Sequence, residues 1–153
     1  ENLVNAILPE LNELINFKKE DFGVEIFKGD EGIKTVFNEF LRIGQDLVIF
    51  GIDESYFKKN LGSFMDHYLR KQKQIGFKER ILTKEGIKEI YSNKMTTYRF
   101  LPKESFNPTP TYVSKEYIAI LIWEPLHIIK IKNAGLADSY RKHFELLWEQ
   151  AKK

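Results

Sequence analysis

The sequence predicts a single α/β domain, with a mixed β-sheet flanked by helices and an N-terminal helical arm in front of it. The 153 residues, 42% hydrophobic and 14% aromatic, suffice for one packed core. Up to residue 101, strand patterns alternate with amphipathic helix patterns, which is typical of parallel strands joined by helices. Three closely spaced strand patterns and a final helix follow, which indicates antiparallel hairpins and therefore a mixed sheet.

Residues 1–17 form the predicted arm, and residues 18–153 the domain. Apolar residues at steps of three and four give the arm a hydrophobic seam, as in a short coiled coil: Val4, Ile7, Leu11 and Leu14. So short a helix is marginal by itself, so the seam must be buried against the domain or a second copy. Two interpretations stay open. The arm either packs on its own core, or joins the domain to a missing N-terminal module and dimerises the protein.

The first half of the domain alternates strands and helices. Five apolar positions recur at i, i+3, i+4, i+7 and i+8: Ile33, Val36, Phe37, Phe40 and Leu41. They predict an amphipathic helix with Asp30 as its N-cap and Gly44 as its C-cap. Continuous apolar character over 46–50 predicts a strand buried on both faces. The other predicted elements are strands over 22–27 and 77–82, and helices over 61–75 and 84–92.

The second half holds more strands and one closing helix. Strands are predicted over 96–101, 111–113, 117–123 and 126–132. A loop rich in Pro, Ser and Asn separates the first two of them. The closing helix covers 136–150, and its predicted inner face consists of Leu136, Tyr140, Phe144, Leu147 and Trp148.

The formal net charge of +2 hides a strong asymmetry along the chain. Residues 1–57 hold 5 basic and 12 acidic residues, whereas residues 58–103 hold 12 basic and 4 acidic residues. The basic segment could bind an anion, nucleic acid or an acidic partner surface. Alternatively, its charges are only the solvated faces of helices.

Residues that carry catalytic or metal chemistry are scarce. His67, His127 and His143 fall on three separate elements without the spacing of a zinc site. Cysteine is absent, which excludes disulfides and thiol chemistry and suits a reducing cytoplasm. The apolar run at 117–123 is far too short for a membrane helix. We therefore predict a cytoplasmic protein with no metal, no cofactor and no membrane partner.

Five residues are candidates for a ligand-binding cleft. Arg80 and Arg99 lie inside strand patterns, where a charge needs a partner or a path to water. The others lie where apolar strands end, and ligands of α/β sheets gather at such ends. The predicted cleft comprises Gly51, Arg80, Arg99, Trp123 and Glu124, with Phe106 as a lid. For each residue, the alternative is a structural role as an ion pair with a helix or as a core aromatic.

The order of several segments resembles a known family. The segment 26–34 (IFKGDEGIK), followed by an apolar strand closed by Phe50 and Gly51, resembles the opening of the effector domain of archaeal TrmB-like transcriptional regulators. Three further segments match in order: 98–102, the strand pair 117–123 with 126–132, and 140–149. The resemblance covers roughly residues 20–150.

The resemblance implies a fold and a set of partners. Such regulators carry an N-terminal winged helix-turn-helix, a coiled-coil arm and then this domain, whose fold is similar to a half-unit of phospholipase D. It implies a homodimer, a small-molecule effector, and DNA contacts made only through the winged helix-turn-helix, which these residues lack. Phospholipase D enzymes need a His-x-Lys-x-x-x-x-Asp motif whose histidine attacks phosphorus. No histidine here has a lysine two positions later.

We therefore expect the effector-sensing and dimerisation domain of a DNA-binding transcriptional regulator, and not an enzyme. Two alternatives remain open. One is a phospholipase D-like phosphodiesterase with an atypical nucleophile, for which His127 is the candidate. The other is a pure protein-interaction module, in which the acidic and basic segments meet across a subunit interface.

Overall fold

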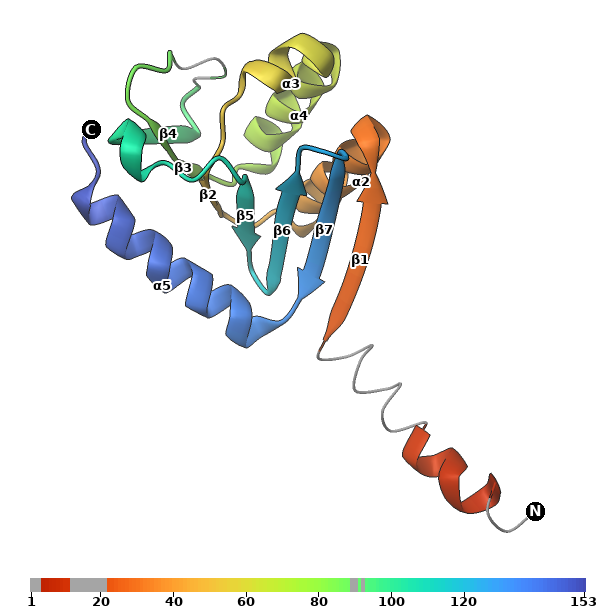
Figure 1. The fold of residues 1–153 in the computed structure, drawn as a ribbon. Coiled ribbons are helices and arrows are strands. Elements are labelled where there is room, and N and C mark those ends of the chain that lie inside the picture. The colour runs from red at the N-terminus through yellow and green to blue at the C-terminus, as the bar shows by residue number, and fades with distance from the viewer. Residues whose placement is uncertain (1–3, 12–21, 89–90, 92) are drawn as a thin grey trace.

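Seven strands form one mixed sheet in the order β1-β7-β6-β5-β2-β3-β4 (Figure 1). The computed structural model describes residues 4–11, 22–88, 91 and 93–153. The strands are β1 (Gly23–Lys28), β2 (Leu47–Phe50), β3 (Glu79–Lys84), β4 (Thr96–Leu101), β5 (Thr111–Ser114), β6 (Tyr117–Ile122) and β7 (His127–Lys132). Strands β2, β3 and β4 are mutually parallel, and every other neighbouring pair is antiparallel. The predicted mixed α/β sheet is confirmed.

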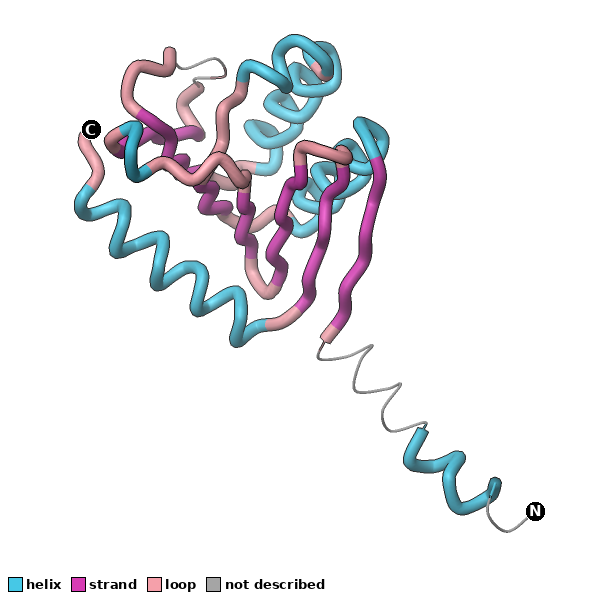
Figure 2. Tube along the Cα trace, in the orientation of Figure 1, coloured by secondary structure: helices cyan, strands magenta, loops and turns pink. Residues whose placement is uncertain are grey.

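Helices cover both faces of this sheet (Figure 2). One face carries α2 (Gly29–Ile43), α3 (Ser55–Asn60) and α4 (Gly62–Ile75), and the other carries α5 (Ala134–Gln150). A short 3-10 helix, Lys103–Ser105, lies in the loop after β4. None of the helices in the part of the chain that the structure describes combines the length and the apolar character of a membrane span.

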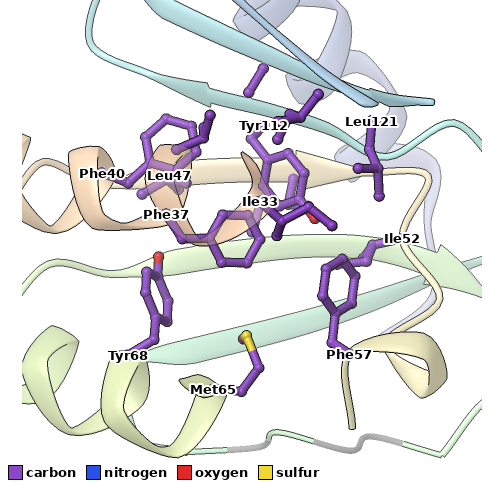
Figure 3. Packing of buried hydrophobic residues seen from close by; sticks show 14 of the residues in the cluster. Ile33, Phe37, Phe40, Leu47, Ile52, Phe57, Met65, Tyr68, Tyr112 and Leu121 are labelled. Carbon is purple, nitrogen blue, oxygen red and sulfur yellow. The ribbon is translucent and has the colours of Figure 1, made fainter. Parts of the chain in front are cut away.

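The larger core lies between the sheet and helices α2 to α4, and it is rich in aromatic rings. Phe37 lies at its centre (Figure 3), with its ring stacked 5.8 Å from that of Phe57 and edge-on to Tyr112 at 5.3 Å. Aromatic pairs at such separations add about 0.5–1.5 kcal/mol each beyond the area that they bury. Strand β2 contributes Leu47 and Ile49 to this core.

The smaller core lies beneath α5. This helix buries Ala137, Phe144 and Trp148 against residues that include Val48 of β2. Strand β2 therefore has buried residues on both faces, as its continuous apolar sequence predicts, although its neighbour β5 is antiparallel to it.

Three local predictions are wrong. No helix forms in the described part of 84–92: Lys84 ends β3 and a turn follows, in which Gly86 has a positive φ of 85°. Asp30 does not cap α2, which begins one residue earlier; its carboxylate instead accepts a hydrogen bond from the Tyr56 hydroxyl at 2.8 Å. On α5, Leu136 is exposed and its neighbour Ala137 is buried instead.

The C-cap prediction is confirmed, because Gly44 ends α2 in the left-handed conformation with φ 61°. The described part of the predicted arm, residues 4–11, is a helix whose residues are all exposed. Leu14 lies outside the described residues. The arm's role in dimerisation stays a prediction.

Candidate functional site

A cleft of about 260 Å³ opens at the carboxyl ends of β2 and β3. It is lined by Gly51, Asp53, Ser55, Tyr56, Lys84, Phe106, Pro108 and Trp123. These residues come from five segments: the end of β2, the start of α3, the end of β3, the 102–110 loop and the end of β6. This is the position at which α/β sheets bind ligands.

Gly51 allows the 106–109 segment to pack against the end of β2 at the base of the cleft. Its φ is +82°, and a Cβ placed there would lie 2.3 Å from the Thr109 carbonyl oxygen and 2.6 Å from that of Asn107. Both contacts are with backbone, which cannot rotate away as a side chain would. Only glycine therefore lets the 106–109 segment approach β2 this closely.

Two aromatic side chains of the cleft are fixed by hydrogen bonds. The Trp123 indole N–H donates to the Pro108 carbonyl at 3.0 Å, and its ring lies edge-on to Tyr56 at 4.9 Å. The Tyr56 hydroxyl donates to Asp30 in the first turn of α2. Burial, together with this carboxylate, raises the pKa of Tyr56, so the hydroxyl stays a donor. The wall of the cleft is therefore preorganised.

One carboxylate and one ammonium group lie at the cleft. Asp53 Oδ1 accepts hydrogen bonds from the Ser55 backbone N–H at 3.1 Å and from the Ser55 hydroxyl at 2.7 Å. Its Oδ2 lies 3.7 Å from Lys84 Nζ, and the two side chains are 38% and 35% exposed. Burial alone would raise the pKa of Asp53, but Ser55 and Lys84 outweigh it and lower this pKa. Both charges remain within reach of a ligand.

The arrangement suits a small organic molecule. Phe106, which lies 5.4 Å from Lys84 Nζ, joins Tyr56 and Trp123 in offering aromatic surface from three segments. Ligand sites typically combine such apolar walls with a few placed polar groups, and here Asp53 and Lys84 supply an acceptor and a donor. None of the three histidines lines the cleft.

The structure does not bring the five predicted ligand-binding residues together. Gly51 and Trp123 line the cleft, but Glu124 is exposed in the turn between β6 and β7. Arg80 and Arg99 point to the α5 side of the sheet, where each contacts α5 itself.

Both arginines already have partners on α5. Arg80 pairs through two nitrogens with the carboxylate of Glu145, one contact measuring 3.1 Å, and lies 5.1 Å from the ring of Phe144. Arg99 donates to the Trp148 carbonyl at 2.7 Å, and its guanidinium lies 4.6 Å from the Trp148 ring. These contacts match the structural alternative, an ion pair with a helix, rather than a free ligand site.

Five residues that line the cleft were not predicted: Asp53, Ser55, Tyr56, Lys84 and Pro108. The sequence carried a signal for one of them, since an Asp two residues before a Ser is a common turn and capping pattern. Tyr56 and Lys84 could not be found in this way, because α3 was not anticipated and β3 was expected to end at Leu82 rather than at Lys84.

A buried carboxyl group lies elsewhere, under α4. Glu79, at the start of β3, is 6% exposed and accepts a hydrogen bond from the Tyr68 hydroxyl at 2.6 Å. Burial raises the pKa of Glu79 to about 7. The cavity beside it measures about 20 Å³, enough for roughly one water molecule. It is too small for an organic ligand.

The basic segment of the sequence appears on the surface of α4. A groove of about 450 Å³ is lined by Leu69, Arg70, Lys73, Asn93, Lys94 and Met95. Throughout the described ranges, no group of three or more His, Cys, Asp or Glu residues could hold a metal ion.

No protein-family model matches the sequence, and no curated protein matches it. Solved structures do. Nuc from Salmonella typhimurium, a phospholipase D family member, has a TM-score of 0.60 at 11% identity, covering 86% of this chain and 97% of Nuc. The fold is phospholipase D-like. NucT from Helicobacter pylori has a TM-score of 0.54 at 10% identity, covering 86% of this chain and 99% of NucT.

A third similar structure is TrmBL2, an archaeal chromatin protein that shows a novel mode of DNA binding. Its TM-score is 0.54 at 16% identity, and the match covers 99% of this chain but only 64% of TrmBL2. The chain thus spans less than two thirds of TrmBL2. At such identities the likeness shows the fold.

Proposed function

We propose that this chain is the effector-sensing and dimerisation domain of a DNA-binding transcriptional regulator, and that it is not an enzyme. One observation carries the proposal: the carboxyl-end cleft of this phospholipase D-like fold holds aromatic rings, Asp53 and Lys84, but no histidine. The His-x-Lys-x-x-x-x-Asp motif is absent from the whole sequence. A phospholipase D-like fold that lacks the catalytic histidine can still bind a small molecule in its cleft.

The effector would be a small molecule with a flat apolar face and at least one polar group. The flat face would contact Tyr56, Phe106 and Trp123, and the polar group would reach Asp53 or Lys84. Because the cleft joins β2, β3, β6 and the 102–110 loop, a bound molecule would favour one arrangement of these segments over another. That is a population shift, for which about 1–3 kcal/mol of differential affinity suffices.

The DNA contact would be made by a winged helix-turn-helix on the N-terminal side of the arm. The structural likeness to TrmBL2, which binds DNA, supports this assignment. In a homodimer, the effector would alter the spacing of two such modules relative to half-sites one helical turn apart.

Thermal unfolding of the chain in the presence of a panel of common metabolites tests the cleft. We expect at least one compound to raise the melting temperature, and Asp53→Asn combined with Lys84→Gln to weaken its binding at least tenfold. Arg70→Gln, a charge removed from the distant groove on α4, is the matched control and should leave binding unchanged. If the compound binds the double variant as tightly as it binds Arg70→Gln and the wild type, it does not bind in the cleft.

A phosphodiesterase assay tests the enzyme alternative. We expect no turnover of bis(p-nitrophenyl) phosphate above the rate in buffer. If the chain hydrolyses this substrate and His127→Ala abolishes the hydrolysis, the chain is a phosphodiesterase and our proposal is wrong. His127 starts β7, and its Nδ1 lies 3.0 Å from the Pro125 carbonyl oxygen, away from the cleft lining.

A further inference from the structure

The α5 side of the sheet is covered over only part of its width. Helix α5 packs over β2, β5 and β6. Strands β7 and β1 lie beyond it at the end of the sheet (Figure 1). The covering layer that domains of this class place on each sheet face is therefore incomplete here.

The strand register places aliphatic residues in rows across this region. Ile26 of β1 is paired with Ile129 of β7, which is paired with Ile120 of β6. In the next row Val24 is paired with Ile131. Six residues on this side of the sheet make up what we call the open face: Val24, Ile26, Ile120, Ile122, Ile129 and Ile131.

Exposure on the open face rises with distance from α5. In the row of Ile131, Ile118 of β6 is fully buried, whereas Val24 of β1 is 50% exposed. Ile26 is 64% exposed, and Ile122 is 38% exposed. These exposed aliphatic side chains form one contiguous patch, which is a candidate interaction surface.

The position of β1 in the sheet keeps Val24 and Ile26 on the outer surface. On its other side, Phe27 packs on the larger core, and Glu25 pairs with Lys130 at 2.9 Å. Gly32 of α2 lies so close to the backbone of Phe27 that a Cβ would meet it at 2.8 Å. A shift of one residue would expose Phe27 and bury Glu25, so the register is fixed with Val24 and Ile26 outside.

The size of the open face indicates what covers it. Three strands of six residues span about 14 Å by 20 Å, or about 280 Å². A standard interface buries about 800 Å² per partner, so this face alone is too small for a sheet-to-sheet dimer. A helix is about 10 Å wide, so one helix fits on this face, and the eight helical residues 4–11 extend about 12 Å along it.

The N-terminal helix of this chain has the surface that such a contact needs. Residues 4–11 are helical, and four large aliphatic side chains are 44–60% exposed: Val4, Ile7, Leu8 and Leu11. The helix projects beyond the start of β1, away from its own sheet (Figure 1). Residues 1–17 hold three Glu and no Lys or Arg, and the open face ends at Lys28 and His127.

We propose that the N-terminal helix of one copy lies on the open face of a second copy, and the reverse, in a two-fold symmetric exchange. Because the exchange is two-fold symmetric, the same contact is made twice in the dimer. The inference rests on the dimer that we propose above, and it names the surface that forms it.

Cysteine cross-linking tests this arrangement, because the chain has no cysteine of its own. A Leu8→Cys chain mixed with an Ile26→Cys chain should form a disulfide-linked dimer under mild oxidation. Each chain alone should stay uncross-linked. Linkage of the Leu8→Cys chain to itself would show that two arms pair with each other, which overturns the open-face contact but keeps the dimer. A double variant that links only within one chain would also overturn it.

Light scattering separates the two proposals. We expect the wild type to be a dimer, Ile26→Glu to weaken association at least tenfold, and Leu146→Glu to leave it unchanged. Leu146 is the matched control, because it is 55% exposed on α5 but outside the open face. A dimer that Ile26→Glu leaves intact overturns this inference alone. A monomeric wild type overturns the proposed dimerisation as well.

Discussion

The two tryptophans of the chain mark regions that use similar residue types differently. Trp148 is 7% exposed, stacks on Phe144 with ring centroids 5.4 Å apart, and lies beneath the guanidinium groups of Arg80 and Arg99. Trp123 is only partly buried, and it borders a cleft together with the half-exposed Asp53 and Lys84.

The difference lies in where the charges find their partners. Around Trp148, Arg80 pairs with Glu145 of α5 and Arg99 with a carbonyl of α5, so the cluster attaches a helix to the sheet. Around Trp123, the ammonium and carboxylate are 3.7 Å apart and accessible. Both ion pairs are partly exposed, but the pair of Arg80 joins a helix to the sheet, whereas that of Lys84 borders a cleft, where it can serve a ligand.

Truncation of each tryptophan tests this contrast with the largest expected effect. Trp148→Ala should lower the free energy of unfolding by about 3–5 kcal/mol, since it empties a buried site and removes the surface under two arginines. Trp123→Ala should cost about 1 kcal/mol and abolish effector binding. Urea unfolding measures both. Equal losses of stability would remove the distinction between the regions.

Glu79, buried under α4, predicts a pH dependence of stability that is opposite in sign to that of Glu145 on α5. The pKa of Glu79 rises from 4.5 to about 7 on burial, so the folded state holds the proton more tightly than the unfolded state. Stability should therefore fall by about 3 kcal/mol as the pH rises from 4.5 to 7. Urea unfolding across this range should show the slope, and Glu79→Gln should flatten it. A slope that Glu79→Gln leaves unchanged would assign the effect to other groups.

Gly51→Ala changes the base of the cleft. The added Cβ would clash with two carbonyl oxygens at a positive φ, so we expect a loss of about 1–3 kcal/mol and weaker effector binding. Gly62→Ala is the matched control, since a Cβ there meets nothing within 4 Å. Thermal unfolding compares them. Equal tolerance of both substitutions would mean that the loop does not close on Gly51.

The smallest expected effect concerns Glu145. The hydrogen bond from Arg80 lowers its pKa, so this carboxylate stabilises the fold above pH 4.5, and that contribution is lost as the pH falls further. The Glu145 side chain is 49% exposed, so solvent screening limits the effect to less than about 1 kcal/mol. Glu145→Gln should reduce stability slightly at pH 7 but not at pH 3. A loss at both values would point to packing instead.

Periodicity in the sequence predicted the sheet and most helices, because residues such as Phe37 and Phe144 repeat at helical spacing and are buried. It failed for α3, which is only six residues long and buries one side chain, Phe57. It also failed for 84–92, where a turn interrupts the expected helix.

For a related reason, only two of the five predicted ligand-binding residues line the cleft. Gly51 and Trp123 lie at strand ends, and such ends meet at one edge of the sheet. Arg80 and Arg99 lie within strands, where the side of the sheet that a residue faces depends on register. A charge in a strand shows that a partner exists, but the sequence does not say whether that partner is a ligand or a helix such as α5.

Nitrogen–proton correlation spectra of the chain test the central claim most directly, because its two tryptophans give two indole N–H signals. The signal that is missing from the spectrum of Trp123→Phe belongs to Trp123, and the remaining one belongs to Trp148. With the metabolite that raises the melting temperature, we predict that the Trp123 signal shifts, since its N–H donates to the Pro108 carbonyl at the cleft, while the Trp148 signal stays in place. A shift confined to Trp148, or no shift of Trp123 on binding, would contradict the account.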